Sequence, residues 1–122
     1  MEKPISRQMH GAIDYLYSAI VPFMPEIAGY SDEEKAKLLS RILGGGAFAY
    51  SALTKSEWGI FKLLPFKAHL VIDLGVSLFA LGSPWILGFS KNKAARNALI
   101  AIGAAGLTAS LLTQNKEMDK DV

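Results

Sequence analysis

Apolar residues dominate four long stretches of the chain that contain no charged side chain, at residues 15–25, 42–54, 74–90 and 97–115. Helix-start and helix-end signals around these stretches predict four helices, at about residues 7–24, 31–54, 67–82 and 92–113. Ser31 and Glu34 have capping-box spacing at the start of the second helix. Because few segments alternate polar and apolar residues as strands do, the pattern indicates an all-α bundle.

The third and fourth predicted helices have no polar face. Residues 74–89 and 99–112 are apolar or small on every side, and a four-helix protein has too few neighbouring helices to bury them. We therefore expect an integral-membrane four-helix bundle. Only the last uncharged stretch reaches the roughly 18 residues expected of a membrane span, and the mean hydropathy is a modest +0.26. A water-soluble bundle is the alternative.

The second half of the chain repeats the first half without a gap, 59 residues later. Residues 10–56 and 69–115 are identical at 13 of 47 aligned positions, whereas ordinary residue usage gives about three by chance. The match indicates a duplicated two-helix unit, with repeat 1 at about 7–56, a link at about 55–66 and repeat 2 at about 67–115. Two helices per unit imply parallel repeats, related by a pseudo-two-fold axis along the membrane normal.

The link between the repeats has a pattern of its own. Thr54 and Glu57 are spaced as a second capping box, and Trp58, Phe61 and Leu64 supply an apolar edge. We predict a short helix lying in the membrane interface, with an apolar loop as the alternative. The side that holds the link and both termini carries seven Lys and Arg residues against six on the opposite side, which slightly favours cytoplasmic termini.

Length and composition restrict the function classes. The 122 residues form a single domain, residues 1–122. A net charge of +2, without Lys and Arg clustered among aromatic residues, argues against nucleic acid as a partner. The chain has no cysteine, so disulfides, thiolate metal sites and cysteine nucleophiles are excluded. We expect no secretory signal peptide at the N-terminus.

Polar residues with ligand chemistry recur at matching positions of the two units. In each unit three such residues are spaced i, i+4, i+8, which places them along one helix face over about 12 Å. An ionised carboxylate costs about 2.5–3.5 kcal/mol in a membrane, so each aspartate should face the interior and pair with the histidine one turn away. The candidate cofactor-binding residues are His10, Asp14 and Ser18 in repeat 1 and His69, Asp73 and Ser77 in repeat 2.

Three interpretations of these residues stay open. In the first, His10, His69, Asp14 and Asp73 form an N2O2 ligand set for zinc or iron, or the two histidines are axial ligands of a haem. In the second, they handle protons or admit a small ion, because histidine titrates near neutrality. In the third, the pairs only fix helix packing in a structural or partner-binding membrane module. No nucleophile elbow or phosphate-binding loop is present, so a non-enzymatic protein is favoured over an enzyme.

Several short motifs resemble the SPW-repeat family of small bacterial membrane proteins. The signature-like segment is Gly-Ser-Pro-Trp-Ile-Leu-Gly-Phe at residues 82–89, and residues 10–15, 54–59 and 65–69 are similar to other parts of the family pattern. The resemblance implies a four-helix integral membrane protein built from two repeats. We expect it in a bacterial inner membrane, with lipid around it and with a second copy or another membrane protein as its candidate partner. The resemblance implies no activity. Repeat 1 has Met24-Pro25-Glu26 in place of Ser-Pro-Trp.

Overall fold

The computed structural model describes residues 3–117, and within that range the protein is helical. Its elements are α1 (Arg7–Ile20), η1 (Val21–Phe23), α2 (Met24–Ala28), α3 (Glu34–Ala52), α4 (Phe66–Ile86) and α5 (Lys93–Leu112). Pairing between strands is limited, in the described residues, to two isolated bridges. The all-α prediction is therefore confirmed.

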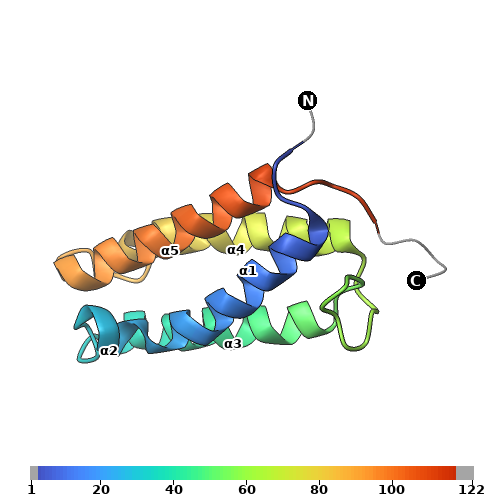
Figure 1. Cartoon of the computed structure of the whole chain (residues 1–122). Helices are drawn as coiled ribbons and strands as arrows, with labels where there is room; N and C mark the ends of the chain where they lie inside the picture. Colours follow the sequence, from blue (N-terminus) through green and yellow to red (C-terminus); the bar gives the residue numbers. More distant parts are fainter. Residues whose placement is uncertain (1–2, 118–122) are drawn as a thin grey trace.

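The helices form two packed pairs (Figure 1). Helix α4 packs along α5, and α1 crosses α3 obliquely. The link and the terminal segments lie at one end of the bundle, whereas the α2–α3 and α4–α5 turns lie at the other. The apolar core is concentrated toward the end with the turns, where Tyr30, Leu39, Leu43, Phe89 and Leu99 are buried together. At the opposite end, polar side chains are buried beside Phe66 and Leu70.

The two turns at the core end share the same backbone geometry. Gly29 and Gly88 adopt left-handed φ values of 82° and 83°, which glycine tolerates without steric cost. The next residue in each case donates back to a proline carbonyl, Tyr30 N to Pro25 O at 2.8 Å and Phe89 N to Pro84 O at 2.8 Å. Each turn thereby directs a large aromatic side chain into the core.

Proline changes the helix ends that the sequence pattern predicts. The first helix gives way to the 3₁₀ turn η1 at Val21, ahead of Pro22, because proline cannot donate to the preceding turn. By contrast, α4 continues through Pro84 to Ile86. The Ser83 hydroxyl donates to Ala80 O at 2.8 Å, so it supplies a hydrogen bond to the carbonyl that the proline nitrogen cannot reach. The helix therefore runs past its predicted end at about residue 82.

Neither predicted capping box forms. Helix α3 begins at Glu34 with Glu33 as its N-cap and no capping side chain. The Thr54 hydroxyl donates to Tyr50 O, 2.5 Å away, instead of capping a helix in the link. The link itself is irregular and is held to the end of α3 by Leu64 N donating to Leu53 O at 2.7 Å. The predicted interfacial helix is therefore wrong, and the loop alternative describes the link.

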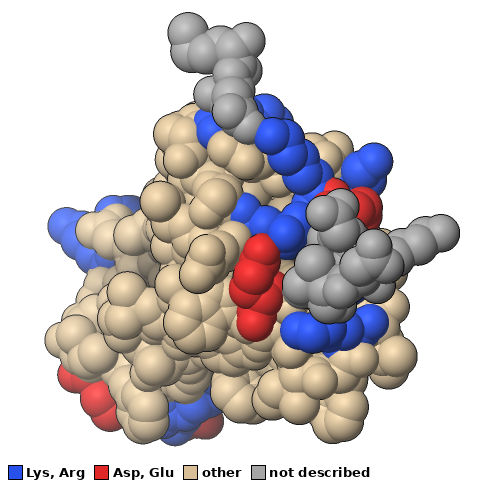
Figure 2. Space-filling model, turned by 45° about the vertical axis from the view of Figure 1, so that its right-hand side comes forward, with Lys and Arg blue, Asp and Glu red and all other residues tan. Residues whose placement is uncertain are grey.

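Large apolar side chains cover much of the outer surface. Leu16, Ile42, Val71, Leu78 and Ile86 are each more than half exposed. Helices α4 and α5 are both long and apolar enough to cross a membrane. Figure 2 shows broad uncharged surface, with Lys, Arg, Asp and Glu gathered in a few patches, several of them at the margins of the view.

Candidate metal centre

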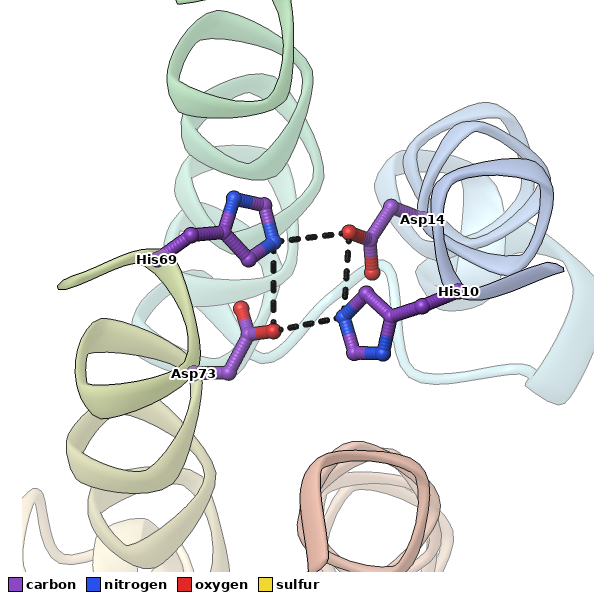
Figure 3. A group of neighbouring side chains, drawn as sticks. All are labelled: His10, Asp14, His69 and Asp73. Carbon is purple, nitrogen blue, oxygen red and sulfur yellow. Dashed lines mark hydrogen bonds and ion pairs between the residues drawn. The ribbon is translucent and has the colours of Figure 1, made fainter. Parts of the chain in front are cut away.

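Two histidines and two aspartates meet between α1 and α4 (Figure 3). His10 Nε2 lies 2.9 Å from Asp73 Oδ2, and His69 Nε2 lies 2.8 Å from Asp14 Oδ2. The contacts within each helix are longer, at 3.2 Å for both His10–Asp14 and His69–Asp73. The four side chains therefore form a closed ring of alternating imidazole and carboxylate groups, here called the His/Asp ring. Each helix supplies one histidine and one aspartate.

The His/Asp ring is shielded from water. The two histidines are 1% and 2% exposed, and the Asp73 and Asp14 side chains are 8% and 15% exposed. Phe66, at the start of α4, stacks on His69 and contacts His10 edge-on, with ring centroids 5.8 Å apart in both cases. Because water is largely excluded, attraction between the groups is stronger than it would be at the surface.

Two threonines orient the imidazole rings. His10 Nδ1 lies 2.7 Å from Thr113 Oγ1, and His69 Nδ1 lies 2.6 Å from Thr54 Oγ1. Each threonine hydroxyl uses its single hydrogen on the backbone carbonyl four residues earlier, Ala109 O or Tyr50 O. The hydroxyl oxygen can then only accept from the histidine, so each Nδ1 carries a proton. Nε2 is the nitrogen left to face the carboxylates.

Asp73 has a further partner that Asp14 lacks among residues 3–117. The Tyr50 hydroxyl donates to Asp73 Oδ1, the oxygen that does not contact the histidines. Tyr50 also packs against His69, with ring centroids 4.8 Å apart. Tyr50 therefore directs Asp73 Oδ2 into the His/Asp ring. No sequence signal marked Tyr50, because the matching position in repeat 2 is Ala109.

The dimensions of the His/Asp ring suit a transition-metal ion. One ligand atom from each of the four residues lies within 4.8 Å of all the others. An ion bound at 2.0–2.2 Å in the plane of such a ring needs opposite ligands about 4.0–4.4 Å apart, so a contraction of a few tenths of an ångström suffices. A tetrahedral zinc ion needs ligands about 3.3–3.6 Å apart and therefore a larger shift of the side chains. Each histidine donates Nδ1–H to a threonine, and this leaves the Nε2 lone pair free to bind a metal. Metal-binding histidines usually have such a partner on the other ring nitrogen. Two imidazoles and two carboxylates suit zinc, iron or copper.

A haem does not fit the same site. The space between His10 and His69 is occupied by the carboxylates of Asp14 and Asp73, and the two imidazole centroids are only 5.4 Å apart. Two axial ligands must stand on opposite faces of a wide porphyrin plane, with no side chain between them. The geometry thus separates the metal-ion hypothesis from the haem hypothesis.

The two serines of the predicted stripe lie outside the His/Asp ring. The Ser18 hydroxyl donates to Tyr15 O at 2.9 Å. Ser77 is buried and lines a small cavity beside the ring. The structure thus brings together four of the six candidate residues and adds Thr54, Thr113 and Tyr50. The repeat marks both threonines, because each unit ends in a threonine at the level of the histidines.

Comparison with known proteins gives no independent guide to this site. No protein-family model, no curated protein and no solved structure matches the chain.

Proposed function

We propose that this chain is an integral membrane protein that binds one divalent transition-metal ion in the His/Asp ring, near the membrane face that holds the link and both termini. The observation that carries this proposal is the convergence of two Nε2 atoms and two carboxylate oxygens, with both Nδ1 atoms engaged by threonine. The ring lies near that end because His10 and His69 fall within four residues of the starts of α1 and α4. The proposed role is metal binding without a catalysed reaction.

The membrane environment is supported by the surface and by the distribution of charge. Large exposed apolar side chains lie on α1, α3, α4 and α5, and such surface is rare on soluble monomers. After its first turn α4 has one charged residue, Asp73, and α5 has none after Arg96. Buried carboxylates in such a setting are expensive and usually functional. The four-helix membrane architecture implied by the SPW-repeat resemblance is part of this proposal.

The proposal also includes a pseudo-two-fold relation between the repeats. Two equivalent hydrogen bonds support it, one between His10 and Thr113 and the other between His69 and Thr54. The 59-residue shift relates the two histidines to each other and the two threonines to each other. The isolated bridges Ile5–Thr113 and Thr54–Leu64 are related by the same shift. An axis through the His/Asp ring would exchange the two histidines and the two aspartates. A duplicated pair of ligands would thus close a single site.

A structural role is the second candidate, because the His/Asp ring can satisfy itself. With protons on both Nε2 atoms, two imidazolium groups face two carboxylates and the net charge is zero. Such a ring would hold α1 against α4 without a metal. Proton handling has less support, since neither Asp14–Ile20 of α1 nor Asp73–Ile86 of α4 contains a further Asp, Glu, His, Lys or Arg.

Metal stoichiometry in purified protein tests the proposal. The chain contains only two histidines, so a histidine-free affinity tag leaves His10 and His69 as the sole imidazole ligands. After loading and removal of excess ion, mass spectrometry should find one metal per chain. His10→Gln and His69→Gln should each abolish binding, whereas Ser18→Ala should retain it. Substoichiometric metal that neither histidine substitution changes would reject metal binding and favour the structural role.

A further inference from the structure

We infer that the metal site has an exchangeable coordination position, and that it takes a ligand of two or three heavy atoms with a hydrogen-bond acceptor, such as a triatomic anion. This inference rests on the proposed metal binding and adds a ligand class to it. Its basis is a cavity beside the His/Asp ring, on the side facing the middle of the bundle. The His/Asp ring would supply four metal ligands, and the cavity would hold a fifth, exchangeable ligand.

The cavity is small and adjoins three of the four ring residues. It has a volume of about 60 Å³ and is lined by His10, Asp14 and Asp73 together with Tyr17, Ser77 and Gly106. One water needs a cavity of only about 10–15 Å³, so there is room for a small ligand. A bulky organic substrate is excluded by the same volume. Phe66 packs against the two histidine rings, so a small ligand would approach the ring from the cavity.

The two repeats differ at a position that lines the cavity. In repeat 1, Tyr50 on α3 places its hydroxyl on Asp73 of α4. The residue 59 positions later is Ala109 on α5, and it lines the cavity together with Asp14. Where one aspartate has a tyrosine over its outer oxygen, the other has open space. Tyr50 and Asp73 line the same cavity, so the short side chain of Ala109 leaves space there that a second tyrosine would fill.

The absence of a side chain at Gly106 leaves room for the Ser77 hydroxyl. A Cβ on Gly106 would lie 2.4 Å from Ser77 Oγ, and that hydroxyl is on the cavity wall. Within residues 3–117 the hydroxyls of Ser77 and Tyr17 have no hydrogen-bond partner. Ser77 is 94% buried, being 6% exposed. Both hydroxyls can donate to a molecule in the cavity, which is why the expected ligand is an acceptor.

An apolar groove continues the cavity toward the outer surface. Ile13, Tyr17 and Ala105 line both the cavity and the groove between α1 and α5. Side chains at these three positions therefore separate the His/Asp ring from the lipid-facing side of the bundle.

Azide titration of the copper(II)-loaded protein tests the inference, because azide is a triatomic acceptor anion and gives a charge-transfer band when it binds copper. The wild type should show a saturable band at one azide per copper. Ala109→Tyr, which places the repeat 1 side chain in the cavity, should weaken azide binding at least tenfold while retaining one copper per chain. Ala109→Phe should do the same without adding a hydroxyl. The control is Ala104→Tyr on the exposed side of the same helix, which should behave as the wild type.

Loss of a donor should have a smaller effect than filling the cavity. Ser77→Ala and Tyr17→Phe should each weaken azide by about two- to tenfold, the range of one hydrogen bond. A wild type that holds copper but gives no azide band would overturn the inference while leaving metal binding intact. Equal azide affinity in the Ala109 variants and the wild type would also overturn it. Failure of the wild type to hold copper above the level of His10→Gln would instead reject the metal site itself.

Discussion

His10 contacts Asp73, 63 residues away in the sequence, more closely than it contacts Asp14 in the next turn of its own helix. The two Nε2–Oδ2 distances are 2.9 Å and 3.2 Å. His69 shows the same preference, for Asp14 over Asp73. Each histidine therefore has its closer carboxylate on the other helix, so neither repeat contains a complete site. Five predictions follow from this arrangement and from its surroundings.

The threonines should contribute to metal affinity although they are not ligands. Thr54→Val and Thr113→Val remove the acceptor that holds Nδ1–H of His69 or His10. Loss of such a partner costs about 10- to 100-fold in metal affinity. Competition with a chromophoric chelator measures the change. Thr108→Val, at an exposed position of α5, is the matched control, and an equal affinity for all three variants would contradict the prediction.

The aspartates should stabilise the metal-free protein. Asp73→Asn leaves two histidines with one carboxylate, and its amide has a single acceptor oxygen in place of the two that serve the histidines and Tyr50. Breaking a buried ion pair costs about 3–5 kcal/mol, and Asp14→Asn should cost less because Asp14 has no tyrosine partner. Denaturant unfolding in detergent measures both. Asp32→Asn in the exposed α2–α3 turn is the control, and an Asp73→Asn effect no larger than this control would be inconsistent with the pairing.

The contact between the link and α1 should depend on pH. The Arg7 guanidinium donates to both Glu57 oxygens, at 2.9 and 2.7 Å, and this pairing lowers the pKa of Glu57. A carboxyl with a lowered folded pKa stabilises the fold above its unfolded pKa, and the contribution is lost as pH falls through the folded value. At pH 7 the wild type should therefore be more stable than Glu57→Gln by less than about 1 kcal/mol. Its thermal midpoint should be correspondingly higher.

That difference should shrink as the pH falls below about 4, since the unperturbed pKa of glutamate is about 4.3. Thermal scans of both proteins between pH 7 and pH 3 measure it. Glu34→Gln is the control, because the Glu34 side chain is 81% exposed. A gap between wild type and Glu57→Gln that widens on acidification would have the wrong sign for this contact.

The Ser83 hydroxyl should stabilise the fold only while Pro84 follows it in the helix. Ser83→Ala removes the donor to Ala80 O in a buried environment, and an unsatisfied buried carbonyl costs about 1–3 kcal/mol. In a Pro84→Ala background the restored backbone N–H can reach the same carbonyl, so the added Ser83→Ala change should cost little. A double-mutant cycle on the free energy of unfolding measures the coupling. Equal costs in both backgrounds would show that the hydroxyl acts in another way.

The exposed apolar surface should make the protein dependent on detergent. After cell lysis, the chain is expected in the membrane fraction, resistant to alkaline carbonate and released by detergent, because more than half of each Leu16, Val71 and Leu78 side chain is exposed. Immunoblotting of the fractions measures this, with a peripheral membrane protein as the control. Recovery of monodisperse protein from the soluble fraction without detergent would favour the water-soluble alternative.

Local patterns in the sequence were enough to place the helices and to select the central residues. The uncharged apolar stretches predicted the positions of α3, α4 and α5 to within a few residues, because a helix needs only its own residues to satisfy its backbone. The four-residue spacing placed His10 above Asp14 and His69 above Asp73 on single helix faces for the same reason. Gly29 and Gly88 recur at matching positions of the two repeats, each at the start of a turn.

Tertiary packing decided which side chains meet. Whether His10 lies nearer Asp14 or Asp73 depends on the distance between α1 and α4, which no periodicity along one helix contains. Tyr50 joined the site because α3 lies beside α4, and Ala109 left a cavity because its side chain is too short to fill the equivalent space. The capping box predicted at Thr54 failed because His69 offered its hydroxyl a buried partner. Helix formation is set by neighbours in sequence, whereas a binding site is set by neighbours in space.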